Sequence, residues 1–165
     1  MQIQPVKTNE QIQTVARLAN EIWRQHYDGI VPAAQIDYML ANLQSAGAIE
    51  RQIKDKNYNY YLMRDDCGYF RGYFAFIIEK DKIFLSKLYV QKDSRKKGYA
   101  KKALAFMADT AKNLKLSSIY LTVARENVQS IEAYKKMNFS ITETINIDIG
   151  GGFFMNDYKM SLKVE

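Results

Sequence analysis

Apolar residues in the N-terminal part of the chain recur with the period of a helix. They return every three or four positions, at Ile12, Val15, Leu18, Ala19, Ile22 and Trp23. This spacing predicts a helix with one buried face, which Thr8 or Asn9 can cap. Pro32 can open a second helix that runs to Leu43. The pattern therefore predicts two helices before the first strand.

The middle of the chain changes to shorter apolar segments bounded by turn residues. Residues 57–64, 72–79 and 82–90 are rich in aromatic and β-branched side chains, and short polar turns separate them. These segments predict strands joined as an antiparallel meander. The helical period then returns, with small or apolar side chains on one face at Ala100, Ala103, Leu104, Met107, Ala108 and Ala111.

The C-terminal part completes an alternation of strands and helices. Residues 117–123 form an apolar segment after the helix, which predicts a strand–helix–strand crossover with parallel strands. Residues 126–139 predict a short helix that ends at Asn138, a residue type that tolerates the left-handed conformation. Residues 140–149 and 153–164 predict two strands joined across three glycines. The class expected is α/β with a mixed sheet.

Length and composition indicate one domain. The chain has 165 residues, of which 47% are hydrophobic, so residues 1–165 can form a single domain with its own core. The N-terminus lacks the pattern of a secretory signal, and no apolar run approaches the ~20 residues that span a bilayer. We therefore expect a soluble, cytoplasmic protein. Cys67 is the only cysteine and His26 the only histidine, which excludes an internal disulfide and argues against a metal site.

Positive charge is concentrated in one stretch. The net charge is +6, and residues 92–102, with six basic side chains and one acidic side chain, contribute +5. Such a local field suggests a nucleotide, a nucleic acid or an acidic membrane surface as partner. Lysines taken alone are more typical of a solvated face. A nucleic acid is disfavoured because Tyr99 is the only aromatic residue in the stretch.

The place of this stretch between a strand and a helix narrows the choice. Gly98 falls in the first turn of the helix, where unpaired N–H groups and the positive end of the helix dipole favour a phosphate. A glycine also lets the backbone approach a phosphate closely. The sequence therefore predicts that residues 95–100 bind phosphate.

Two motifs carry a resemblance to a known family. Arg95, Gly98 and Ala100 match the loop pattern Arg/Gln-x-x-Gly-x-Gly/Ala, and N-x-x-S-x-x-x-Y-K-K-M-N-F follows at 127–139. With these motifs on a strand, loop, helix, strand and helix in that order, the chain resembles the GNAT family of acetyl-CoA-dependent N-acetyltransferases over nearly its whole length. The resemblance implies a mixed, mostly antiparallel sheet flanked by helices, with parallel strands that splay apart at the acetyl-CoA site.

The resemblance also implies how acetyl-CoA is held. The residues implied at its pyrophosphate are Arg95, Lys96, Lys97, Gly98, Tyr99 and Ala100. Leu88, Tyr89 and Val90 would pair with the pantetheine arm as an added strand does, and Asn127 and Ser130 would hold the other side of that arm. Leu88 and Val90 would be buried without any ligand, and Asn127 would cap its helix without one. No metal is implied.

The catalytic roles are implied only in part. Tyr134 matches the tyrosine that would protonate the leaving thiolate, although packing alone could explain a tyrosine there. The glutamate that many relatives carry on the preceding strand is absent, because Ser86 stands in the corresponding stretch. The base is therefore left open between Glu79 and His26.

The acceptor is implied to be the primary amine of a small molecule, such as a polyamine, that attacks directly in a ternary complex. Four residues are predicted to bind it: Trp23, His26, Tyr27 and Tyr158. Asp28, Asp37, Asp148 or Asp157 could attract the ammonium group, and core packing is the alternative for the aromatic residues. A silent acetyl-CoA-binding regulator, acetylation of a protein N-terminus or lysine, and a homodimer are left open. No nucleic-acid or membrane partner is expected.

Overall fold

The first helix begins directly after Thr8, one of the two residues predicted to cap it. In the computed structural model, which describes residues 1–165, the Thr8 side chain caps α1 (Asn9–His26) by accepting from the Gln11 N–H. The Gln11 side chain accepts in return from the Thr8 N–H at 2.9 Å. This reciprocal pair is a capping box, and it satisfies two N–H groups that the helix cannot pair internally.

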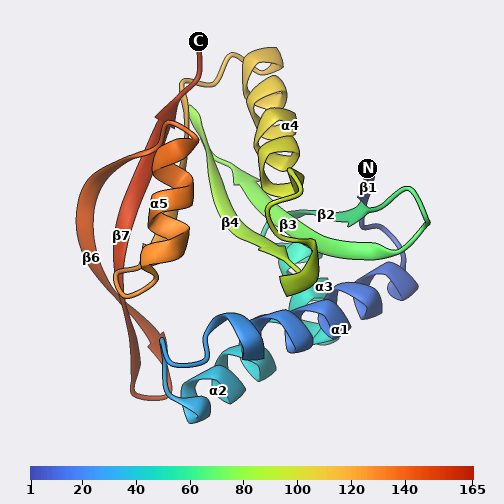
Figure 1. The fold of residues 1–165 in the computed structure, drawn as a ribbon, viewed down its shortest axis with the longest axis vertical. Helices are drawn as coiled ribbons and strands as arrows, with labels where there is room; N and C mark the ends of the chain where they lie inside the picture. The colour runs from blue at the N-terminus through green and yellow to red at the C-terminus, as the bar shows by residue number, and fades with distance from the viewer. The chain divides into compact units, whose positions relative to one another are not determined.

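The chain divides into two compact units, of which unit 1 comprises Met1–Ile77 and Lys87–Leu104. Its helices are α1, α2 (Ala33–Leu43) and α3 (Ala46–Asp55), and α1 contacts the other two (Figure 1). Its strands are β1 (Gln2–Pro5), β2 (Asn59–Arg64) and β3 (Phe70–Ile78), paired antiparallel in that order. Buried residues of α1 include Val15, Leu18, Ala19, Ile22 and Trp23, as the apolar period predicted.

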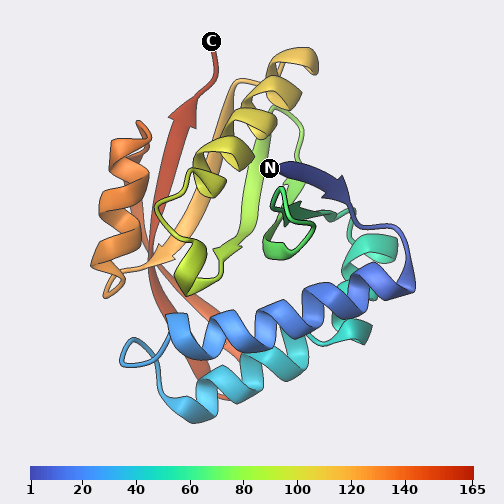
Figure 2. The ribbon, with the colours of Figure 1, turned by 45° about the vertical axis from the view of Figure 1, so that its right-hand side comes forward.

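Unit 2 comprises Ile78–Ser86 and Ala105–Glu165. In it, the first part of β4 (Lys82–Val90) pairs parallel with β5 (Ser118–Ala124). β7 (Phe153–Lys163) pairs antiparallel with β5 on one side and with β6 (Ser140–Gly150) on the other. The predicted parallel crossover and the predicted hairpin are both confirmed. The short helix α5 (Val128–Lys136) lies beside these strands in both views (Figures 1 and 2).

The hydrogen-bonded strand order is β1-β2-β3-β4-β5-β7-β6. The first part of β4 belongs to unit 2 and its second part to unit 1, whereas the helix α4 (Tyr99–Asn113) begins in unit 1 and ends in unit 2. A mixed, mostly antiparallel sheet with helices confirms the predicted α/β class. No helix in the chain combines the length and the apolar character that crossing a membrane requires.

Two elements of unit 1 were not predicted. The sequence pattern indicated two helices before the first strand, whereas the structure has the strand β1 and three helices there. β1 has four residues and includes a proline, so it carries too short an alternation to register as a strand. α3 buries only Ala48, Ile49 and Gln52, although Ser45 caps it by accepting from the Ala48 N–H.

Gly72 allows β3 to approach β4 unusually closely. A Cβ at this position would collide with the carbonyl oxygen of Tyr89 and would lie 2.9 Å from Met63 Cε and 3.1 Å from Val90 Cα. Any other residue would push apart the strands next to Tyr89 and Val90. Gly72 therefore helps to set the course of the end of β4.

Candidate functional site

The basic loop between β4 and α4 has the backbone of an anion site. A short 3₁₀ turn, η1 (Lys92–Ser94), follows β4, and the chain then adopts positive φ at Lys96 (61°) and Gly98 (86°). The Lys102 N–H donates to the Gly98 carbonyl at 3.0 Å and so begins the hydrogen bonding of α4. The N–H groups before Lys102 lie in the turn where a helix has no internal acceptors for them.

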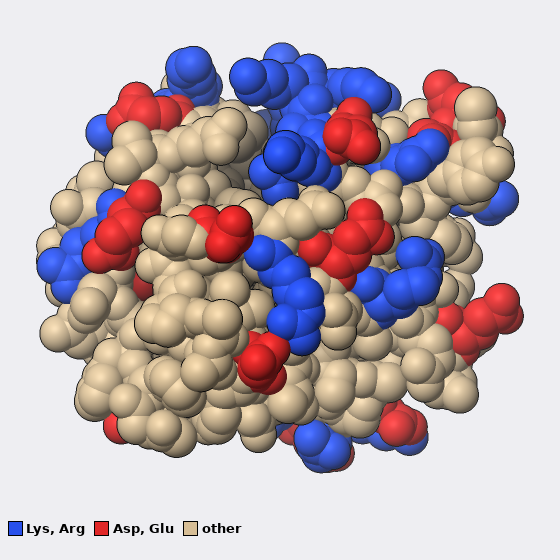
Figure 3. All heavy atoms as spheres, turned by 60° about the horizontal axis from the view of Figure 1, so that its bottom comes forward, with Lys and Arg blue, Asp and Glu red and all other residues tan.

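The loop's side chains leave that turn open. Gly98 is exposed, and a Cβ built on it would have no atom within 4 Å. Lys96 and Lys97 are exposed, whereas the Arg95 Nε donates to the Val90 carbonyl at 3.1 Å and ties the loop to β4. On the face drawn in Figure 3, basic side chains gather near the top, while basic and acidic side chains alternate elsewhere. The loop thus suits a phosphate in backbone geometry and in charge.

An aromatic cluster of α1 and β4 lies in the same unit. The hydroxyls of Tyr27 and Tyr89 share a hydrogen bond of 2.8 Å, and the Trp23 ring lies 5.6 Å from the Tyr27 ring and 5.2 Å from the Tyr89 ring. Trp23 is only 2% exposed and Tyr27 only 8%. Trp23 therefore packs behind the tyrosines and offers almost no surface to a ligand. The sequence analysis assigned Tyr89 only a backbone role at the pantetheine arm. In the structure its side chain belongs to this aromatic cluster.

His26 belongs to the same cluster. Its ring lies edge-on to Tyr27 at 4.9 Å and to Tyr89 at 5.7 Å. Burial, together with a smaller effect of the positive charge of Arg95, lowers the pKa of His26 to about 4. The imidazole is therefore neutral at pH 7, and with such a pKa it is a weak base. The sequence suggested His26 as the base because an ordinary histidine has a pKa near neutral pH. The lowered pKa removes that reason.

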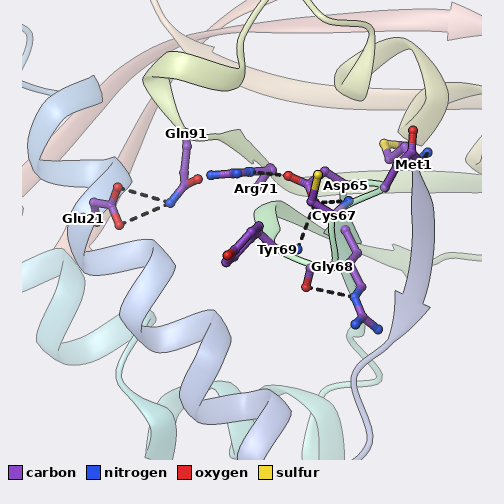
Figure 4. A network of polar contacts seen from close by, with 10 residues as sticks. Met1, Glu21, Asp65, Cys67, Gly68, Tyr69, Arg71 and Gln91 are labelled. Carbon is purple, nitrogen blue, oxygen red and sulfur yellow. Dashed lines mark hydrogen bonds and ion pairs between the residues drawn. The ribbon is translucent and has the colours of Figure 1, made fainter.

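Polar contacts hold the end of β4 against α1 and the β2–β3 turn of unit 1 (Figure 4). The Gln91 side chain donates to Glu21 of α1 at 3.2 Å, and the Gln91 N–H donates to the Arg71 carbonyl at 2.8 Å. Arg71 Nε is 2.7 Å from Asp65 Oδ2, and the ion pair is half-buried. The strand end that carries Tyr89 is therefore fixed from two sides.

Lys87 is a perturbed residue that the sequence analysis did not single out. It is half-buried on β4, and its ammonium group lies 5.6 Å from the centre of the Tyr58 ring. Burial lowers the pKa of Lys87 to about 8. No sequence pattern signalled this, because the contact with Tyr58 joins residues far apart in the sequence.

The predicted residues of the second motif lie in unit 2. Asn127 is 6% exposed, and its side chain caps α5 by accepting from the Ser130 N–H at 3.2 Å. This capping role requires no ligand. Tyr134 is half-buried on the same helix. Tyr158 is on β7, opposite Val123 of β5 and Thr144 of β6.

The end of α5 fixes the position of the Tyr134 ring. Asn138 has φ of 69°, its N–H donates to the Lys135 carbonyl, and the Phe139 N–H donates to the Tyr134 carbonyl, each at 3.0 Å. This is a Schellman ending, and Asn138 takes the left-handed position that was predicted for it. The Phe139 and Tyr134 rings meet edge to face at 5.6 Å, which is the apolar contact that often accompanies such an ending.

Glu79, the other candidate base, is engaged elsewhere in unit 2. Its Oε1 accepts from the Tyr120 hydroxyl at 2.7 Å. Burial raises the pKa of Tyr120 above its usual value, and the contact with Glu79 raises it further. The tyrosine therefore keeps its proton and continues to occupy the carboxylate.

A separate depression of about 330 Å³ lies between α1 and α2 of unit 1. It is lined by Ala16, Asn20, Arg24, Asp37, Leu40, Ala41, Gln44 and Ser45. Arg24 and Asp37 form an ion pair of 2.7 Å there. Of the residues named from the sequence, only Asp37 lines this depression, and the arginine already neutralises it. The chain has no group of three acidic, histidine or cysteine side chains placed to hold a metal ion.

Comparison with known proteins supplies the family. The model of the acetyltransferase (GNAT) family matches residues 15–139. No curated protein sequence matches the chain significantly. The PaiA N-acetyltransferase from Thermoplasma acidophilum, in complex with coenzyme A, is 21% identical with a TM-score of 0.80 over 99% of each chain.

Two further solved structures are similar. A GCN5-related N-acetyltransferase from Rhodopseudomonas palustris is 10% identical with a TM-score of 0.81, over 98% of this chain and 94% of that one. The spermidine N-acetyltransferase from Vibrio cholerae, in complex with CoA and spermine, is 16% identical with a TM-score of 0.71, over 99% of this chain and 95% of that one. At such identities the likeness establishes the fold, which is the one that the two motifs implied.

Proposed function

The chain belongs to the acetyltransferase (GNAT) family, and from this premise we propose that it transfers the acetyl group of acetyl-CoA to a primary amine of a small polyamine. The observation that carries the proposal is the loop from Arg95 to Ala100, with its positive φ at Lys96 and Gly98 and its open backbone. A loop of this kind suits the pyrophosphate of a coenzyme. Acetyl-CoA would supply an activated acetyl thioester.

Backbone groups, positive side chains and a carboxamide are the groups proposed to hold the coenzyme. In unit 1, the Lys96 and Lys97 side chains would add positive field to the backbone N–H groups, and Leu88 to Val90 would offer backbone groups to the pantetheine arm. In unit 2, Asn127 and Ser130 are the residues proposed for the pantetheine arm. Capping of α5 by Asn127 is compatible with this, because a carboxamide has further donor and acceptor positions.

The aromatic cluster supports a cationic acceptor. His26 is neutral at pH 7 and adds no positive charge, so Arg95 is the cation that acts on this cluster. The rings of Tyr27 and Tyr89 can attract an ammonium group. Asp28, next to Tyr27, is exposed and adds negative charge. The V. cholerae enzyme of the same fold binds spermine, which supports this choice among amines.

The reaction requires proton movements at both reacting atoms. An alkyl amine with a pKa near ~10.4 is almost fully protonated at pH 7, so it must lose one proton to solvent before its nitrogen can attack. A base must take a proton from the attacking nitrogen, and an acid must supply one to the leaving sulfur. Tyr134 would be the acid, because a phenol of pKa ~10 can protonate a thiolate whose conjugate acid lies near ~8.5. Its ring is already held by Phe139.

A panel of amines tests the proposal. Acetyl-CoA is incubated with spermidine, a diamine, an amino sugar, an amino acid and a peptide with a free N-terminus, and released thiol is measured. We expect spermidine to give the highest kcat/KM, and we expect the Gly98→Asp protein to release no thiol above background. Preference for the peptide would favour protein acetylation, and tight acetyl-CoA binding without thiol release from any amine would indicate a silent regulator.

A further inference from the structure

Asp157, on β7, is the most deeply buried acidic side chain of the chain. It is 5% exposed, and every other aspartate and glutamate lies at least partly at the surface. Its Oδ1 accepts no hydrogen bond. From this burial and this open acceptor we infer that Asp157 is the general base that takes the proton from the acceptor amine, a role that rests on the proposed function.

The register of the strands places Asp157 at the start of the second motif. It pairs with Ala124, the last residue of β5, and the Ala124 carbonyl accepts from the Asn127 N–H at 3.0 Å. The Arg125 N–H donates to the Asn156 carbonyl at 2.9 Å, so β7 is also held to the turn that leads into α5 (Figure 2). The carboxylate therefore sits where β5 gives way to α5, the helix that carries Tyr134.

An open acceptor on a buried carboxylate is costly and requires an explanation. Burying a polar atom without a hydrogen-bond partner costs stability, and native proteins rarely leave one unpaired. An ionised carboxylate can only accept, so the group that would satisfy Oδ1 is a donor such as an N–H or an ammonium group. An acceptor amine is such a donor.

The surroundings of Asp157 tune it for this task. Its pKa is raised to about 6, chiefly by burial and to a smaller extent by the negative charge of Glu126. A hydrogen bond from Thr122 and the positive charge of Arg125 act in the opposite direction. On the β6 side its partner is Ile145, which has no charge. A carboxylate with this pKa is ionised at pH 7 and is a stronger base than an ordinary aspartate.

The two bases suggested by the sequence fit less well. Glu79 already accepts from the Tyr120 hydroxyl at 2.7 Å. His26 has a pKa of about 4, so it holds a proton less tightly than Asp157 does. Asp157 combines a raised pKa with an oxygen that accepts no hydrogen bond from the chain.

The proton balance of the step is complete with two residues. The amine nitrogen forms a bond to the carbonyl carbon of the thioester, and the carbon–sulfur bond breaks. An ammonium acceptor first gives one proton to solvent; when the neutral nitrogen has attacked, its surplus proton passes to the Asp157 carboxylate. The sulfur keeps the bonding electron pair and takes a proton from Tyr134, and solvent then returns both side chains to their starting states.

The test uses the full chain with spermidine and acetyl-CoA as probes. Replacement of Asp157 by Asn removes the base and nearly preserves the shape, so kcat should fall at least ~10²-fold while acetyl-CoA affinity stays within a few-fold. Asp157→Glu should restore part of kcat. The wild-type profile of kcat should lose activity below about pH 6, and the Asn variant should lack this acid limb. Asp109→Asn, an exposed change in the same unit, should behave as wild type.

A second readout needs no turnover. The carboxyl carbon resonance of Asp157, assigned by its loss in Asp157→Asn, should titrate near pH 6 in the free protein, and its midpoint should move when spermidine and CoA are added. Wild-type transfer with an Asn variant within about threefold in kcat, or a midpoint unmoved by spermidine, overturns the inference. A wild-type protein that acetylates no amine in the panel counts against the proposed function instead.

Discussion

The Phe139 ring meets the Tyr134 ring edge to face, with centroids 5.6 Å apart and planes at 66°. The backbone joins the same two residues, because the Phe139 N–H donates to the Tyr134 carbonyl at 3.0 Å. The helix end therefore positions the ring through contacts that do not involve the hydroxyl. This separation allows the chemistry of the hydroxyl to be tested without disturbing the packing.

Replacement of Tyr134 by Phe should abolish most turnover and leave the fold intact. The ring contact with Phe139 survives, and only the proton donor is lost. General-acid catalysis usually supplies about 10² to 10⁴, so kcat should fall at least ~10²-fold, while acetyl-CoA affinity should change only a few-fold. Steady-state turnover at saturating spermidine and single-turnover mixing would measure the two effects.

The matched control is Tyr69→Phe, the same change at a side chain that is 64% exposed. It should leave kcat unchanged. If chemistry is rate-limiting and Tyr134→Phe still turns over within about threefold of wild type, Tyr134 is a packing residue.

Gly98→Asp should remove acetyl-CoA binding, whereas Gly29→Asp should not. Both glycines are exposed, both have positive φ (86° and 73°), and a Cβ at either would have no atom within 4 Å. Backbone strain should therefore be similar in the two variants, and the difference in binding should report the phosphate alone. Calorimetry should also show wild-type affinity weakening as salt rises. Equal affinities in the two variants would remove the loop from the coenzyme site.

Gly72→Ala and Gly47→Ala should change stability in opposite directions. At Gly72 the added methyl would strike the Tyr89 carbonyl, which cannot move away without displacing β4, so a loss of about 1–3 kcal/mol is expected. At Gly47, in α3, the methyl would meet only the end of the Arg51 side chain at 3.4 Å, and alanine should stabilise the helix by up to about 1 kcal/mol. Urea unfolding of both proteins measures this, and a neutral Gly72→Ala would mean that the two strands can separate without cost.

Local sequence signals predicted much of the fold because they act over a few residues. The apolar face of α1 and the left-handed Asn138 are set by near neighbours in the chain, and both were predicted. The cap is equally local, and Thr8 was one of the two residues predicted for it. β1 escaped prediction because its pairing with β2 joins Gln2 to Arg64, far apart in the sequence. A four-residue segment carries no periodic signal of its own.

In the candidate site, too, local features were predicted and contacts between distant residues were not. The loop motif with Gly98 was visible because it is contiguous. The bond between the hydroxyls of Tyr27 and Tyr89 joins residues 62 positions apart, and no local pattern reports it. The sequence offered Asp157 as one of several acids that could attract an ammonium group, and only the structure shows that it alone is buried.

His26 and Asp157 should impose opposite pH dependences on stability. The pKa of His26 falls from 6.5 to about 4 on folding, so the unfolded chain binds its proton more readily, and this contribution to stability is lost as pH falls below about 6.5. The pKa of Asp157 rises from 3.8 to about 6, so the folded chain binds its proton more tightly, and this contribution is lost as pH rises from about 4 to 6. In the wild type, the two slopes should largely cancel between about pH 4 and 6.

Single variants should reveal each slope. In His26→Gln, no histidine offsets the pH-dependent contribution of Asp157 to stability. The free energy of unfolding should therefore fall as pH rises from about 4 to 6. Asp157→Asn should do the reverse, and stability should rise with pH over the same window. Urea unfolding followed by circular dichroism measures both, with fluorescence of Trp23, the only tryptophan, reporting on unit 1. Parallel pH profiles for the wild type and Asp157→Asn would show that the Asp157 carboxyl titrates normally, since a group with the same pKa in both states contributes no slope.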